Sequence, residues 1–331
     1  MRPALPHPTL RAWLRAALAL TLAAGWCGGA AAQGYPSKPV KIIVPFAAGG
    51  PADNYARFIA QRLQDALGQP FVVEDRPGAG SLIGTDAVAK AAPDGYTLLL
   101  ISNTHTVNET LIASKPYALL RDLAPVAPLN YSDLLLVART GLPVASVREL
   151  VQLARDKPGK LNYASSGNGT PYHMAGELFK SMTGSFIVHI PYRGSAGARV
   201  DVLGGQVDLM FDAVTTMADQ ARAGKVKALA TTGRQRSVLM PEVPTLAEAG
   251  VPGFEATIWL GLMAPKATPK AVVDKLNEAI SKIVALPDVK QLWAKQGATP
   301  LLMTPEAFER YMREDIGKWE RVIKTSGIKA D

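Results

Sequence analysis

Residues 40–53 read Val-Lys-Ile-Ile-Val-Pro-Phe-Ala-Ala-Gly-Gly-Pro-Ala-Asp. The β-branched run at their start predicts a buried strand over 40–46. Apolar residues then recur every fourth position and predict an amphipathic helix over about 52–67, namely Tyr55, Ile59, Leu63 and Leu67. Gly49 and Gly50 carry no β-carbon, so a ligand can approach the backbone closely between the two elements. A strand, a glycine turn and an open helix N-terminus together predict an anion-binding site.

The first 32 residues have the features of a cleaved export signal. Three arginines accompany an apolar run over 16–24, and the alanines at 30–32 offer a small-x-small cleavage site. The apolar run is too short to span a bilayer. We therefore expect a signal peptide over 1–32, a mature chain that starts at Gln33 and a periplasmic location.

Charge and cysteine content narrow the function classes. The formal net charge is +8, and the leader arginines at 2, 11 and 15 have no acidic counterpart, which leaves +5 for the rest of the chain. Basic residues are scattered and not interleaved with aromatics, so no nucleic-acid partner is expected, whereas small anions are. The only cysteine, Cys27, lies in the predicted leader, and Trp26 before it argues against a lipid anchor. The mature chain would then hold no disulfide and no cysteine–metal site.

Strands and helices alternate after the leader. Strands are expected over 40–46, 71–75 and 96–102, with helices over about 52–67 and 81–92 between them. Such alternation predicts a mostly parallel sheet covered by helices on both faces. A second glycine turn over 76–81 opens the second helix, and Ser81 is placed to cap it.

About 300 residues can bury two cores, and we expect two lobes. Residues 33–132 plus 255–331 form the expected first lobe, and residues 133–254 form the second. The second lobe contains expected strands over 134–139, 161–165, 186–190, 207–211 and 226–231.

Capping patterns predict where the later helices begin. Ser146 with Glu149 forms a capping box, and Thr170 before Pro171 repeats the turn-to-helix pattern of the first lobe. After a connecting strand over 256–264, helices are expected to begin at Thr268-Pro269 and Thr304-Pro305. The apolar stripe of the last helix is expected to pack against the first lobe, and it consists of Phe308, Tyr311, Met312, Ile316, Trp319 and Ile323.

Two glycine-led helix N-termini, one in each lobe, are the strongest functional signal. Each offers unpaired amides and about half a positive charge, although glycine turns also serve as ordinary joints in α/β proteins. Arg193 is placed either to pair with an anion or to remain a solvated loop residue, and Asp212 either to accept a ligand hydrogen bond or to cap a helix. Asp53 is expected mainly to stabilise its own helix. His173 is expected to be structural, and His105 is a weaker candidate for lining a cleft.

Enzyme motifs are absent from the sequence. No GxSxG elbow, HExxH pair or metal-spaced His/Cys set occurs. The glycines at 78, 80 and 84 resemble a dinucleotide fingerprint, but the third comes one position late. We expect no catalytic residue, no metal and no cofactor.

Several spaced segments carry a family resemblance. They are Pro45-Phe-Ala-Ala-Gly-Gly50 with Asp53, Arg76-Pro-Gly-Ala-Gly80, Pro93-Asp-Gly-Tyr-Thr97, Tyr163-Ala-Ser-Ser-Gly167, His189-Ile-Pro-Tyr-Arg-Gly194, Gly204-Gly-Gln-Val-Asp208, Pro244-Thr-Leu-Ala-Glu-Ala-Gly250 and Trp259-Leu-Gly-Leu. Over residues 35–329 the chain resembles the solute receptors of tripartite tricarboxylate transporters, the Bug receptors. The resemblance implies a two-lobed α/β periplasmic binding protein of type II-like, Venus-flytrap form. In that fold each lobe is a mostly parallel sheet flanked by helices, and two crossing strands join the lobes.

The resemblance also implies which residues bind a small carboxylate in the cleft. Carried onto this chain, they are Phe46, Ala48, Gly49, Gly50, Asp53, Ser102, Asn103, Thr104, Ser166, Gly167, Asn168, Gly169, Thr170, Arg193, Gly194, Ser195 and Asp212. The chain departs from the family at Pro51-Ala52, where a threonine or serine often follows the glycine pair, so one hydroxyl is missing from the first loop.

The expected function is capture of a mono- or dicarboxylate, aliphatic, aromatic or amino acid, and its delivery to inner-membrane permease subunits. An alternative is a ligand-sensing receptor that docks on a sensor ectodomain, and a secreted hydrolase would require turnover. Phe46, Tyr172 and Trp259 are candidates for an aromatic slot, with core packing as their alternative role.

Overall fold

The computed structural model describes residues 34–328 and divides the chain into Met1–Ser37 and a compact body from Lys38 onward. Residues 34–37 form bends that include a cis peptide bond between Tyr35 and Pro36. The predicted signal peptide over 1–32 lies outside the described residues.

Within the described residues the strands form a single sheet of ten, in the order β2-β1-β3-β9-β4-β7-β5-β6, with β10 and β8 paired to β4. The strands are β1 Val40–Val44, β2 Phe71–Asp75, β3 Thr97–Ser102, β4 Leu123–Arg139, β5 Asn162–Ser165, β6 Val188–Pro191, β7 Leu209–Ala213, β8 Val226–Thr231, β9 Thr257–Pro265 and β10 Ala298–Pro300. Every strand expected from the sequence is found, β2 and β8 with the expected ends and the others with shifted ends. The part of β4 before residue 134 and the strand β10 were not anticipated.

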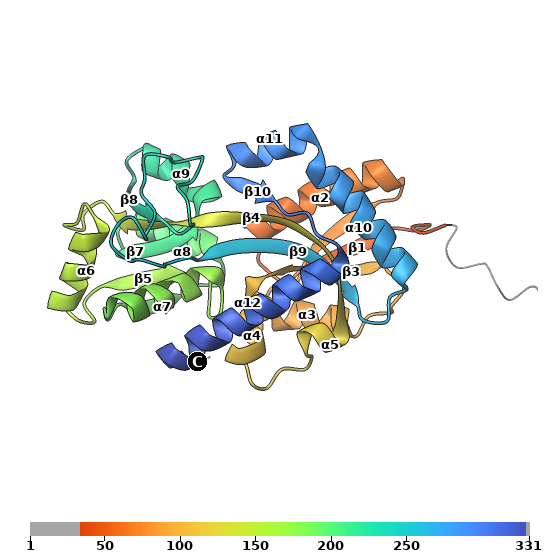
Figure 1. Cartoon of the computed structure of the whole chain (residues 1–331), viewed down its shortest axis with the longest axis horizontal. Coiled ribbons are helices and arrows are strands. Elements are labelled where there is room, and N and C mark those ends of the chain that lie inside the picture. Colours follow the sequence, from red (N-terminus) through yellow and green to blue (C-terminus); the bar gives the residue numbers. More distant parts are fainter. Residues whose placement is uncertain (1–33, 329–331) are drawn as a thin grey trace, which may run out of the picture. The chain divides into compact units, whose positions relative to one another are not determined.

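Helices flank the sheet (Figure 1). They are α2 Pro51–Leu67, the 3-10 turn η1 Ala79–Ser81, α3 Leu82–Ala89, α4 Asn103–Leu111, α5 Leu119–Asp122, α6 Val147–Asp156, α7 Pro171–Thr183, α8 Ser195–Leu203, α9 Val214–Arg222, α10 Lys270–Ala285, α11 Pro287–Lys295 and α12 Pro305–Ser326. Three of them, α4, α5 and α11, were not anticipated. Among residues 34–328 no helix has the length and apolarity needed to cross a bilayer.

The predicted helix starts are confirmed at two of the capping residues. The hydroxyls of Thr170 and Thr304 accept hydrogen bonds from the amides three residues on, at the starts of α7 and α12. The Ser146 hydroxyl caps α6, but Glu149 reaches the amide of Ala145 in place of that of Ser146. The predicted cap by Ser81 is wrong, because Ser81 has a φ of 81° and its side chain makes no capping bond.

The long strand β4 joins two halves of the sheet. It pairs antiparallel with β9 from Leu123 to Asp133, and from Leu134 onward it pairs with β7. Figure 1 shows β4 and β9 running side by side through the middle of the body, as the expected crossing strands should. We call the half with β1–β3, β9 and β10 the first lobe and the half with β5–β8 the second. The change of partner falls between Asp133 and Leu134, and the domain boundary at 132/133 stays a prediction.

The register brings the carboxyl ends of both sets of parallel strands to the middle of β4. Ser102, the last residue of β3, lies opposite Leu260, and Leu260 pairs with Asn130. Ala213, the last residue of β7, pairs with Leu134. The two strand ends are therefore registered only four positions apart along β4, and in α/β proteins this edge is where ligands bind.

Helix α12 packs on both lobes, which corrects the expectation that its stripe packs on the first lobe alone. Phe308 and Met312 join the cluster around Ile43 and Trp259, as expected. Trp319, farther along the same helix, belongs to a cluster that contains second-lobe residues such as Phe211 together with Val107 and Leu111 of α4. A helix of 22 residues is about 33 Å long, enough to extend from α4 to α7 (Figure 1).

The contact of α12 with β9 gives a test of packing. A methyl group added at Gly261 would collide with the Phe308 ring and lie 3.0 Å from the carbonyl oxygen of Ala127. Overpacking of this kind lowers the free energy of unfolding by about 1–3 kcal/mol, and we expect that loss for Gly261→Ala in chemical denaturation. Gly317→Ala is the matched control, because a methyl there meets only the flexible end of Arg321 at 3.9 Å. It should stabilise α12 by about 0.5–1 kcal/mol. Equal losses in both variants would contradict this packing.

Asp133 lies at the point where β4 changes its pairing partner, and it is expected to make the stability of the fold depend on pH. Burial raises the pKa of Asp133 to about 6, with a further contribution from nearby Glu255. The folded protein therefore holds a proton that the unfolded chain, with an aspartate pKa of about 3.9, has already lost. Stability should fall as the pH rises through this window.

Asp133→Asn should remove this loss of stability at higher pH. The variant should be more stable than the wild type by on the order of 2 kcal/mol near neutral pH and equal to it below about pH 4. Urea denaturation at the two pH values measures the difference. A difference that is the same at both pH values would show that the carboxyl group does not titrate in this window.

Candidate ligand-binding site

Four helices that follow the carboxyl ends of parallel strands lack side-chain caps. They are α2 after Gly50, α8 after Gly194, α9 after Ala213, and α3, which differs from the others because it continues directly from η1. Their first amides have no partner within the helix, and each helix start carries about half a positive charge. Helix α7 differs, because Thr170 caps it. The helix starts that remain open to an anion are therefore those of α2, α8 and α9.

Asp53 holds the first glycine turn in place. Its carboxylate accepts a hydrogen bond from the Gly49 amide at 2.8 Å and pairs with Arg57 at 2.6 Å. Arg57 also pairs with Asp75 at the end of β2, at 2.8 Å. Gly49 has a φ of 78°, which favours glycine, and a β-carbon there would meet nothing within 4 Å. Asp53 is buried and serves its own turn, while Ala48 and Gly49 are exposed.

The second glycine turn is held by its own polar groups. Thr170 donates a hydrogen bond to the Gly167 carbonyl at 2.7 Å, and the Gly169 amide donates to Nδ1 of His173 at 3.1 Å. Burial lowers the pKa of His173 to about 4, and its ring stacks on His189 with centroids 4.0 Å apart. His173 is thus a neutral structural residue, as expected. Ser166, Gly167 and Asn168 remain half-buried at the surface of the turn.

The loops of the two lobes approach each other closely. A β-carbon built on Gly194 would lie 3.4 Å from the β-carbon of Ala47, and one built on Gly80 would lie 3.8 Å from the Asn168 carbonyl oxygen. The first contact brings the starts of α2 and α8 together. The second glycine turn meets η1 and α4 instead.

Ser102, Asn103 and Thr104 lie at the start of a helix and not in the expected loop, and their contact with a ligand stays a prediction. Ser102 caps α4, and Asn103 and Thr104 lie in the first turn of that helix, each at most 1 % exposed. The Asn103 side chain donates to the Thr257 carbonyl at 2.9 Å, which ties α4 to the start of β9. These three residues therefore hold β3 and α4 against β9 beneath the cleft.

His105 is buried and does not line the cleft. It is fully buried, its Nδ1 lies 3.2 Å from the Ser102 amide, and its Nε2 lies 3.1 Å from the Thr85 hydroxyl. Burial lowers its pKa to about 4, so the ring is neutral. Phe46 packs edge-on against it, with ring centroids 5.9 Å apart. His105 thus supports the half-buried Phe46 of the first loop from below.

Arg199 is a charged residue near the carboxyl ends of the strands that the sequence analysis did not single out. Asp212 is fully buried, accepts from the Ala213 amide at 2.8 Å and pairs with Nε of Arg199 at 2.8 Å. Arg199 also approaches the hydroxyl of Ser195 at 3.4 Å. Arg193 is exposed and forms no ion pair with any residue in the described part of the chain. The spacing of Ser195 and Arg199, one turn apart on α8, was the available signal.

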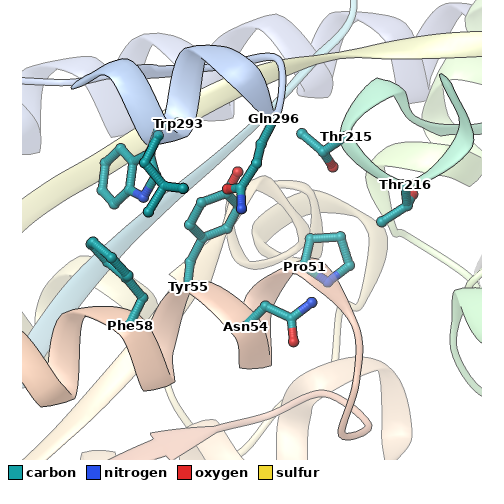
Figure 2. Close-up of a pocket in the computed structure, with 9 residues that line it drawn as sticks. Pro51, Asn54, Tyr55, Phe58, Thr215, Thr216, Trp293 and Gln296 are labelled. Carbon is teal, nitrogen blue, oxygen red and sulfur yellow. The ribbon is translucent and has the colours of Figure 1, made fainter. Parts of the chain in front are cut away.

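A cavity of about 210 Å³ opens between α2, α9 and α11 (Figure 2). Its aromatic wall consists of Tyr55, Phe58 and Trp293. These are not the residues expected to form an aromatic slot. Tyr172 and Trp259 are 6 % and 1 % exposed and pack in the hydrophobic cores. Within residues 34–328 no cluster of three or more histidine, cysteine, aspartate or glutamate residues is placed to bind a metal.

Comparisons with known proteins agree with this architecture. Residues 55–328 match the family described as the tripartite tricarboxylate transporter family receptor. Protein BugT of Bordetella pertussis is 40% identical over 308 residues, which cover 92% of this chain and 94% of BugT. The structure of R. palustris Rpa4515 with adipate is 35% identical with a TM-score of 0.86, covering 89% of this chain and 99% of that one. The periplasmic binding protein BugD gives 37% identity and a TM-score of 0.84, covering 90% and 100%.

The expected fold class is confirmed by these structures, which share the two-lobed α/β fold of periplasmic binding proteins. The family is one of solute receptors and not of enzymes. The chain belongs to the tripartite tricarboxylate transporter receptor family.

Proposed function

We propose that the chain is a periplasmic receptor that closes on a small carboxylate and delivers it to the membrane permease of a tripartite transporter. The observation that carries the proposal is the contact between Ala47 and Gly194, which brings the uncapped starts of α2 and α8 together. Two such helix starts supply several amide donors and about one positive charge in sum. That is the complement of one carboxylate group.

Solved relatives support this class of ligand. Rpa4515, which shares the fold at a TM-score of 0.86, was solved with adipate. Adipate is an aliphatic dicarboxylate, and binding of a carboxylate by this chain follows by analogy. The predicted leader over 1–32 supports export to the periplasm.

The buried charges at the site are arranged so that they do not repel an anion. Asp212 is fully buried at the end of β7 and would oppose a second negative charge nearby. Arg199 pairs with it at 2.8 Å, and the Arg199 side chain is 20% exposed. The ion pair therefore allows an anion to bind close to a buried carboxylate. We assign Arg199 as a positioning residue, which acts through Asp212.

Gly50→Val tests the proposed grip. Gly50 has an ordinary φ of −82°, and a β-carbon there meets nothing closer than the Ala47 carbonyl oxygen at 3.6 Å. The variant should therefore fold normally while its side chain occupies the space in front of the α2 amides. We expect a loss of at least about tenfold in affinity for the carboxylate that binds the wild type, measured by calorimetry.

Gly141→Val is the control for this test. Gly141 is exposed in the turn after β4, beyond the amino end of β7 and hence at the far end of that strand from Asp212. The Gly141→Val variant should bind the ligand as the wild type does. Unchanged affinity in Gly50→Val would show that the α2 start does not grip the ligand.

Arg199→Ala should weaken both the fold and binding. Removal of one partner from a buried ion pair costs about 3 kcal/mol, and burial raises the pKa of the Asp212 left behind. Adding Asp212→Asn to Arg199→Ala should restore most of the stability, because no buried charge then lacks a partner. Urea denaturation of both single variants and the double variant measures the coupling. Simple additivity of the two losses would contradict the pairing.

A further inference from the structure

We infer that the cavity between α2, α9 and α11 receives the end of the ligand that lies away from its carboxylate, and that this end is an uncharged ring with a hydrogen-bonding substituent. The inference rests on the proposed carboxylate-binding function and names its substrate class. Aromatic monocarboxylates with a hydroxyl or similar group on the ring fit the description.

The cavity adjoins the proposed carboxylate site on both lobes. Pro51, which lines it, directly follows Gly50 at the start of α2. Thr215 and Thr216, which line it from the second lobe, follow Asp212 by three and four residues. A ligand held at the helix starts therefore has this cavity within reach. Because both lobes line it, an occupant also favours the closed form.

The first-lobe wall is apolar and mutually packed. The Tyr55 and Trp293 rings meet edge-on with centroids 5.4 Å apart, and Phe58 lies 5.6 Å from Trp293. Figure 2 shows these three side chains together along α2 and beneath α11. An engineered cavity of about 150 Å³ binds benzene, so a cavity of about 210 Å³ accommodates a ring with a small substituent.

No charged side chain lines the cavity. Its polar residues are all neutral, and they are Asn54, Tyr55, Thr215, Thr216 and Gln296. A second carboxylate placed there would lose its hydration without gaining a cation, which is strongly unfavourable. The cavity thus differs in chemistry from a site suited to the far end of a dicarboxylate such as adipate.

The Tyr55 hydroxyl lacks a hydrogen-bond partner. Tyr55 is only 6% exposed, lines the cavity, and its hydroxyl makes no hydrogen bond within the described chain. Burial raises the pKa of Tyr55 above its ordinary value, so the group is a phenol that can donate a hydrogen bond. The buried hydroxyl oxygen of Thr215 also lacks a partner. Buried polar groups are normally hydrogen-bonded, and a ring substituent beside Tyr55 would give its hydroxyl a partner.

The test begins with a panel of carboxylates and the wild-type protein. Adipate, phenylacetate and 4-hydroxyphenylacetate are titrated by calorimetry, each against protein freed of ligand by unfolding and refolding. The inference predicts that the ring compounds bind more tightly than adipate and that the hydroxylated ring binds more tightly than the plain one.

Two variants locate the ring. Asn54→Trp fills the cavity from an exposed position on α2 and should lower the affinity for both ring compounds at least about tenfold. Gln61→Trp, at an exposed position farther along α2, is the matched control and should bind as the wild type does. Tyr55→Phe keeps the ring and removes the donor, so it should lower the affinity for 4-hydroxyphenylacetate about three- to tenfold and leave phenylacetate unchanged.

The outcomes separate this inference from the proposed function. Binding of adipate with no binding of the ring compounds overturns the inference and leaves the proposed function standing. Unchanged affinity of Asn54→Trp for the ring compounds also overturns it. If the wild type binds no compound of the panel, neither the proposed function nor the inference survives. Ring binding that is lost in Asn54→Trp and retained in Gln61→Trp supports both.

Discussion

The arrangement of this receptor depends on the backbone pairing of β4. Its hydrogen bonds tie the start of β9 to Asp133 and the end of β7 to Leu134, so the two lobes are registered against adjacent residues of one strand. Because side chains alternate between the two faces of a strand, a slip of one residue would move every side chain of β4 to the opposite face of the sheet. The five consecutive residues from Leu134 to Ala138 are all fully buried, so each would then meet a core packed around a different side chain. The buried side chains of β4 therefore enforce the register. Because of this register, the carboxyl ends of both sets of parallel strands face the same gap between the lobes.

The residues that approach each other across the gap between the lobes have small side chains or none. The contact between Ala47 and Gly194 involves one methyl group and one glycine, and that between Gly80 and Asn168 is made by backbone. Gly194 has a φ of 114°, a conformation in which a larger residue would be strained as well as crowded. Such contacts bury little apolar surface. The apolar contact between the lobes comes instead from the cluster that joins α4 and α12 to second-lobe residues.

Local pattern was enough to predict much of the fold. The β-branched run of β1 and the fourfold recurrence that begins at Tyr55 are local signals, and capping by Thr170 and Thr304 depends on residues three positions away. Family resemblance supplied the two lobes and the crossing strands. The remaining errors come from tertiary contacts. Asn103 and Thr104 are polar and follow a strand, which favours a surface loop, yet hydrogen bonds and packing from distant segments bury them in α4.

The site was predicted less completely for the same reason. Arg193 stands where a loop arginine could meet an anion, but its neighbour on α8, Arg199, forms the ion pair with Asp212. Helical spacing shows that Ser195 and Arg199 share a face, but it cannot show which strand that face meets. Likewise the apolar stripe on α12 shows which of its residues are buried. It does not show that Trp319 shares a cluster with second-lobe residues. Aromatic residues were expected at Tyr172 and Trp259, whereas the cavity is walled by Tyr55, Phe58 and Trp293 from helices that are far apart in sequence.

Pro51 connects the sequence departure with the cavity. A serine or threonine at this position would offer a hydroxyl to a polar ligand beside the glycine pair. Proline offers only carbon and suits the first position of a helix, because its missing amide hydrogen needs no partner there. In this chain Pro51 lines the cavity opposite the Thr215 hydroxyl, so loss of one polar group makes that wall more apolar without opening the helix start. The free amides of α2 remain available for a carboxylate, while the space beside them becomes suited to the uncharged part of the same molecule. Under the proposed function, this one substitution changes the ligand preference while the amides proposed to bind the carboxylate stay in place.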